Sequence, residues 1–88
     1  MPVISQFYGI LIYIFIEIGG HHHKPHIHAK YNEYEIAMTF EGEKLNGNMP
    51  KKQLKLIEAW VEIHKDELYA AWYAYNNDGE IIKIKGLE

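Results

Sequence analysis

The chain has 88 residues, a formal net charge of −3, no cysteine, and nine basic residues that are all lysine. Hydrophobic residues make up 48% of it, so we expect one folded domain over residues 1–88 and not a disordered segment. The acidic balance and the absence of arginine argue against nucleic-acid binding by this chain alone, and the absence of cysteine excludes disulfides and thiolate metal sites.

The first predicted element is a strand within the apolar run FYGILIYIFIEI, residues 7–18. Isoleucine occupies every second position from Ile10 to Ile18, and β-branched residues at period two favour a strand. Apolar residues also fill the alternate positions, so we expect both faces of this strand to be covered. The run is closed by Glu17 and is shorter than the roughly 20 residues that span a bilayer. We therefore expect a cytoplasmic protein without a membrane segment.

A β-hairpin is predicted next, starting at about His26, because Pro25 cannot donate a backbone hydrogen bond. The alternation of apolar residues changes parity across Asn32-Glu33, which indicates a two-residue hairpin loop. This loop pairs Tyr31 with Tyr34, Ala29 with Ile36 and Ile27 with Met38 on an inner face. His26 and His28 then lie on the outer face.

The second half of the chain predicts a short edge strand, a helix and a last strand. The edge strand covers residues 43–45, and Pro50 suits the first position of the helix. Apolar residues recur at spacings of three and four until the NNDG turn at residues 76–79, which predicts one long helix. Residues 81–85 predict a final strand. The fold class is therefore α+β, an antiparallel sheet of four to five strands on one long helix, in the order β-β-β-(short β)-α-β.

Four stretches of the sequence together resemble a known family: MPVISQFYGILI, KPHIHAKYNEYEIAM, LNGNMPKKQLKLIEAW and HKDELYAAWYAYNNDGEIIKI. They are similar to the small bacterial proteins grouped as domain of unknown function 4160, over nearly the whole chain. The resemblance implies a stand-alone protein without an established activity, often encoded beside another small protein as in toxin–antitoxin pairs. The matching positions are Pro25, His26, His28, Ala29 and His64.

Five of the six histidines lie within residues 21–28. Two histidines at i and i+2 on a strand share one face, so His26 and His28 could bind one divalent transition metal ion such as zinc. The candidates for further ligands are His21, His22, His23, Glu17 and Glu35. The alternative is a polar strand face whose histidines form hydrogen bonds or contact a partner.

Catalytic residues are not evident from the sequence. No Gly-x-Ser-x-Gly elbow and no phosphate-binding glycine loop are present, so enzymatic activity is an open question. His64 falls on the apolar stripe of the predicted helix. It is either a core-facing histidine hydrogen-bonded to a backbone carbonyl or a tyrosine hydroxyl, or a general acid–base group, and the second role requires proximity to His26 or His28.

Aromatic residues are numerous enough to suggest an interaction surface, for which the candidates are Tyr13, Phe15, Tyr31 and Tyr34. A single helix covers one face of a sheet, and the other face of the first strand is also apolar. We therefore expect a twofold homodimer. Two functional hypotheses follow: a regulatory or interaction module, with a partner encoded by a neighbouring gene, or a small metal-dependent enzyme or metal-binding protein that uses His26 and His28.

Overall fold

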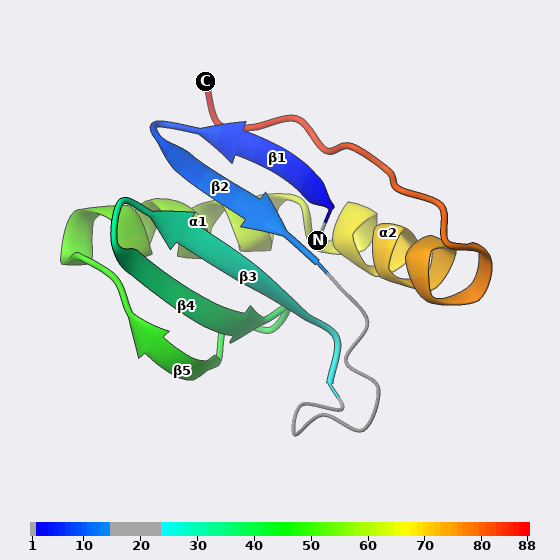
Figure 1. Cartoon of the computed structure of the whole chain (residues 1–88), viewed down its shortest axis with the longest axis horizontal. Coiled ribbons are helices and arrows are strands. Elements are labelled where there is room, and N and C mark those ends of the chain that lie inside the picture. The colour runs from blue at the N-terminus through cyan, green and yellow to red at the C-terminus, as the bar shows by residue number, and fades with distance from the viewer. Residues whose placement is uncertain (1, 15–23) are drawn as a thin grey trace.

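The computed structural model describes residues 2–14 and 24–88. Within these residues, five antiparallel strands are followed by two helices, which confirms the α+β class (Figure 1). The elements are β1 (Val3–Phe7), β2 (Ile10–Tyr13), β3 (His26–Tyr31), β4 (Tyr34–Thr39), β5 (Lys44–Asn48), α1 (Lys51–Ile63) and α2 (Lys65–Asp78). The strands lie in the sheet in the order of the sequence, β1-β2-β3-β4-β5. Each neighbouring pair is therefore connected without a crossover.

The central hairpin has the register that the sequence predicts. The pairs are Tyr31 with Tyr34, Ala29 with Ile36, Ile27 with Met38, His28 with Ala37 and His26 with Thr39. Asn32 adopts a φ of 53°, a conformation that asparagine tolerates better than most residues. The edge strand is also present, although β5 runs further than the residues 43–45 that were expected.

The prediction of one continuous strand from residue 7 is wrong. Tyr8 and Gly9 have φ values of 49° and 78°, which is the pattern of a two-residue hairpin turn, and Phe7 pairs with Ile10 across it. Glycine tolerates this conformation, so the chain reverses where the apolar pattern alone indicates continuity. The additional strand β1 forms one edge of the sheet, and the predicted residues 15–18 lie outside the described part of the chain.

The single long helix is also a wrong prediction, because α1 ends and α2 begins at His64. His64 has φ −107° and ψ 22°, outside the helical region, although its N–H donates to the Trp60 carbonyl at 3.0 Å. The first turn of α2 contains Asp66 and Glu67, and carboxylates there stabilise a helix N-terminus. The expected stop is confirmed, since Gly79 closes α2 in the left-handed conformation.

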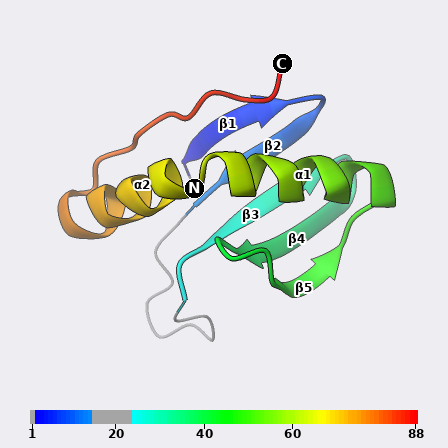
Figure 2. The same cartoon turned by 180° about the vertical axis from the view of Figure 1, so that it is seen from behind.

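The predicted last strand is not a strand in the structure. Residues 79–88 form a tail that runs beside β1 (Figure 2), and Ile84 N–H donates to the Ile4 carbonyl at 2.8 Å. Lys83 Nζ donates to the Val3 carbonyl at 2.6 Å, where a strand ladder would use a backbone N–H. The tail is thus held through side chains and a single ladder-type bond to β1.

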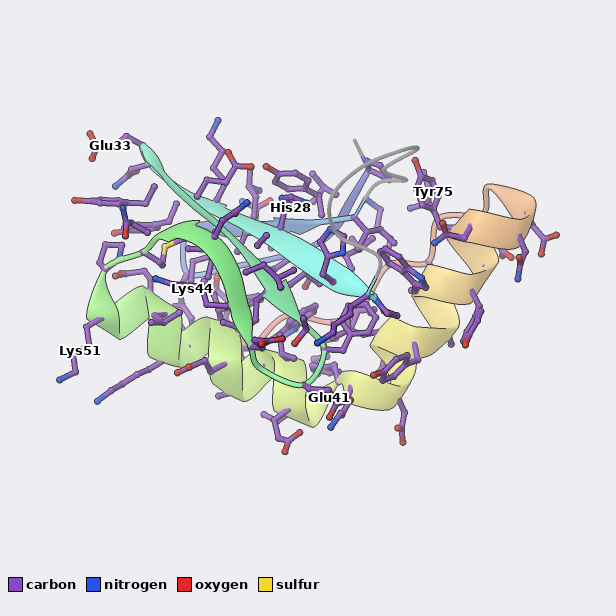
Figure 3. All side chains as sticks on the ribbon, turned by 90° about the horizontal axis from the view of Figure 1, so that it is seen from below. His28, Glu33, Glu41, Lys44, Lys51 and Tyr75 are labelled. Carbon is purple, nitrogen blue, oxygen red and sulfur yellow. The ribbon has the colours of Figure 1, made fainter. Side chains whose placement is uncertain are left out.

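Both helices lie on the same side of the sheet (Figure 2). The core between the two layers is formed by alternate residues of the strands and by one face of each helix. Its largest fully buried members include Phe7, Ile12, Ile27, Ile36, Met38, Phe40, Ile57, Trp60 and Leu68. The other side, which we call the helix-free face, carries the strand residues of opposite parity, among them His28 (Figure 3).

Candidate functional site

A cluster of aromatic and ionisable side chains occupies the helix-free face where β2, β3 and β4 meet. Tyr13 is paired with His28, and their rings stack with centroids 5.6 Å apart and an interplanar angle of 15°. The Tyr13 hydroxyl donates a hydrogen bond to the Glu35 carboxylate. Burial, that hydrogen bond and the charge of Glu35 raise the pKa of Tyr13 above its ordinary value of 10. The phenol therefore remains a protonated donor at neutral pH.

His26 lies beside this cluster at the start of β3 and is 1% exposed. Its Nδ1 is 2.7 Å from the Lys24 carbonyl oxygen, which can only accept, so Nδ1 carries the proton. The ring meets His28 edge-on at 5.1 Å between centroids and lies 5.4 Å from the ring of Trp72. With the proton on Nδ1, Nε2 is the ring nitrogen that a metal ion would use.

The structure brings two of the predicted metal ligands together. His26 and His28 are neighbours on one face, as their spacing predicts, whereas His21, His22, His23 and Glu17 lie outside the described residues. Glu35 is engaged with Tyr13. Within residues 2–14 and 24–88, no group of three or more histidine, cysteine, aspartate or glutamate side chains is arranged to hold a metal ion.

His64 sits at the junction of the two helices. Its Nδ1 is 2.5 Å from Glu67 Oε1, and its ring lies 5.5 Å from the ring of Trp60. His64 thus has a hydrogen-bond partner, but that partner is a carboxylate of α2 and not the expected backbone carbonyl or tyrosine hydroxyl. His64 therefore lies at the junction of α1 and α2, on the other side of the sheet from His28.

The predicted interaction residues fall on two different faces. Tyr13 belongs to the helix-free face, whereas Tyr31 and Tyr34 have the parity of the core residues Ile27 and Ile36. Tyr31 is half-buried against the core and Tyr34 is 39% exposed. Phe15 lies outside the described residues.

Sequence reasoning missed a small cavity of 160 Å³ on the helix-free face, lined by Val3, Leu11, Tyr13 and Lys30. Val3 reaches it because β1 pairs with β2, which places Val3 beside Tyr13. The sequence signal that could have revealed this cavity is Tyr8-Gly9, because a hairpin turn there places Val3 beside Tyr13. The cavity has an apolar wall and one cationic border.

The described helices include none that is long and apolar enough to cross a membrane. Compared with known proteins, the chain matches the family model described as Domain of unknown function (DUF4160) over residues 9–73. The matched segment contains the Tyr13, His28 and Glu35 cluster and ends within α2, before the C-terminal tail. No curated protein and no solved structure matches this chain.

Proposed function

The chain belongs to the DUF4160 family, and we propose that it acts as a protein-interaction module that self-associates through the helix-free face of its sheet. The observation that carries this proposal is the patch around the 160 Å³ cavity, where the partly exposed Val3 and Leu11 form an apolar centre beside the buried Tyr13. Lys30 and Glu35 add charges at its border. An apolar centre with a polar rim is the usual composition of a protein interface.

A second copy of the chain is the partner that the charges favour. Lys30 and Glu35 are opposite each other in the register of β3 and β4, so the border of the patch carries one cation and one anion. A patch with both signs is complementary to itself when two copies meet about a twofold axis. An 88-residue domain also gains stability from burying further apolar surface.

Sedimentation equilibrium of the full chain tests the dimer. We expect the wild type to approach twice the chain mass of 10.3 kDa with rising concentration, and Leu11→Lys to remain monomeric because its ammonium would lie in the apolar centre. Ile63→Lys is the matched control, since Ile63 is 65% exposed on α1, and it should dimerise like the wild type.

A wild-type mass of 10.3 kDa at every concentration would overturn self-association. Calorimetry with the product of the neighbouring gene, the partner that the family resemblance suggests, is the companion measurement. Binding of that protein by a monomeric wild type, lost in Leu11→Lys and kept in Ile63→Lys, would assign the same face to a different partner.

A second candidate function, metal binding, is favoured by the 5.1 Å separation of the His26 and His28 rings on one face of β3. A bound ion could activate a water molecule as a nucleophile. Elemental analysis of protein purified without a nickel column should find one equivalent of a transition metal, lost in His26→Gln/His28→Gln. His64→Gln is the control. Substoichiometric metal, or metal retained in the double variant, would exclude this function.

A further inference from the structure

A larger cavity, of 380 Å³, lies at the opposite side of the sheet, beneath the turn between β1 and β2. It is lined by Tyr8, Tyr31, Lys52, Gln53 and Leu56. The turn and the first residues of α1 lie at the same end of the molecule in both views (Figures 1 and 2). We propose that this cavity binds a small aromatic carboxylate.

Tyr8 is the first observation that points to a ligand. Its φ of 49° belongs to the left-handed region, where a bulky aromatic residue is an outlier and glycine or asparagine is usual in a hairpin turn. The residue is nevertheless 50% exposed, so burial in the core does not compensate this conformation. Strained residues persist where their surroundings hold them, and they concentrate at binding sites.

The surroundings of Tyr8 hold the turn in place. The Glu88 carboxylate accepts a hydrogen bond from the Tyr8 N–H, and Gly9 packs under the ring of Tyr31. A Cβ atom on Gly9 would lie 3.4 Å from Tyr31 Cε1, which is ordinary van der Waals contact. The backbone of Tyr8 is therefore held at the cavity, and Gly9 lies against the ring of Tyr31.

The lining determines the class of ligand. The rings of Tyr8 and Tyr31 and the side chain of Leu56 provide apolar walls that suit a flat aromatic body. Of the five lining residues only Lys52 is charged, and the Gln53 amide beside it offers further hydrogen bonds. The volume of 380 Å³ is within the range of about 300–1,000 Å³ that is typical of small-molecule sites. A ring that carries a carboxylate satisfies the walls and the cation together.

This site is independent of the proposed dimer, because its residues come from the helix side of the sheet and Leu11 lies on the helix-free face. The probes are indole-3-acetate and tryptamine, which share one ring system but carry opposite charges. We expect saturable calorimetric binding of the carboxylate, at least about tenfold tighter than that of the amine, because Lys52 attracts one and repels the other.

Two variants locate the binding. Lys52→Gln should weaken binding of the carboxylate about two- to fivefold, whereas Lys51→Gln, at the neighbouring exposed lysine outside the lining, should leave the affinity unchanged. Tyr8→Gly should weaken it at least about threefold through the loss of one aromatic wall, and it should not lower the melting temperature because glycine suits the positive φ.

Three results would overturn the proposal: no saturable binding of indole-3-acetate at millimolar concentration, equal affinity for tryptamine, or equal effects of the two lysine variants. Leu11→Lys should bind indole-3-acetate as the wild type does. This result separates a failure of the dimer from a failure of the cavity, since each surface is then tested by its own variant.

Discussion

The C-terminal tail should be an integral part of the folded domain, although the family match ends at residue 73. Ile84 is 5% exposed and bonded to Ile4, whereas Ile81 in the same tail is 48% exposed. Ile84→Ala removes three carbon atoms from the core, worth roughly 0.8 kcal/mol each, and leaves a void. We expect the free energy of unfolding to fall by about 2–3 kcal/mol.

That loss is large for a domain of this size. An 88-residue chain has a total stability of about 4–13 kcal/mol, and each 1 kcal/mol shifts its melting temperature by roughly 4–8 °C. Ile84→Ala should therefore melt roughly 8–24 °C below the wild type. Ile81→Ala is the matched control and should change stability by about 0.5 kcal/mol or less, because its side chain is half in solvent.

Urea denaturation followed by circular dichroism measures both variants. Equal stabilities for Ile84→Ala and Ile81→Ala would refute the reasoning, because the tail would then contribute no buried contact. The Trp60 indole provides a second readout, since its Nε1 donates to the Lys85 carbonyl at 2.9 Å. A tail that detaches in Ile84→Ala should expose this indole and shift its fluorescence to longer wavelength.

Two further predictions concern β5 and the loop before it. Gly47→Ala should destabilise the protein by about 2–4 kcal/mol in urea titrations, because φ is 90° and the new Cβ would lie 2.1 Å from the Glu35 carbonyl oxygen; an unchanged midpoint would contradict this. The hydrogen bond from Lys65, at 2.6 Å, lowers the pKa of Glu41, so its stabilisation is complete above pH 4.5 and is lost as the pH falls through the lowered pKa. Glu41→Gln should therefore lower the melting temperature slightly at pH 7 and low salt, and by more than the control Glu43→Gln does. In acid or in high salt, Glu41→Gln and the wild type should melt at the same temperature.

The hairpin of β3 and β4 could be predicted in register because every part of its signal is local. The parity change across Asn32-Glu33 and the two-residue loop determine which residues pair, and the apolar side chains determine which face is buried. The same reasoning failed at Tyr8-Gly9. There apolar residues follow the turn on both parities, so no change of parity marks it, and an aromatic residue occupies a position that normally favours glycine or asparagine.

The helix junction and the tail depend on contacts that a periodicity does not contain. The apolar stripe continues through His64, and only the carboxylates at Asp66 and Glu67 indicate a new helix start. Residues 81–85 have the composition of a strand. Their place is nevertheless set by tertiary contacts, among them the bond from Trp60 to Lys85, which joins the tail to α1. Contacts of this kind decide between a paired strand and an extended segment.

The candidate site was likewise predictable in part: strand alternation predicts the face that its residues share, and tertiary contacts supply their neighbours. Strand alternation alone predicts that His26 and His28 share a face, and the structure places their rings 5.1 Å apart. The partners that define their chemistry come from elsewhere: Tyr13 stacks on His28 from β2, and Trp72 lies against His26 from α2. Trp72 belongs to the helix that begins at the His64 junction, so the environment of His26 depends on the bend that the periodicity concealed. If α2 left the His64 junction in another direction, Trp72 would move away from His26. The sheet would keep its register, because that register is set by its own hairpins.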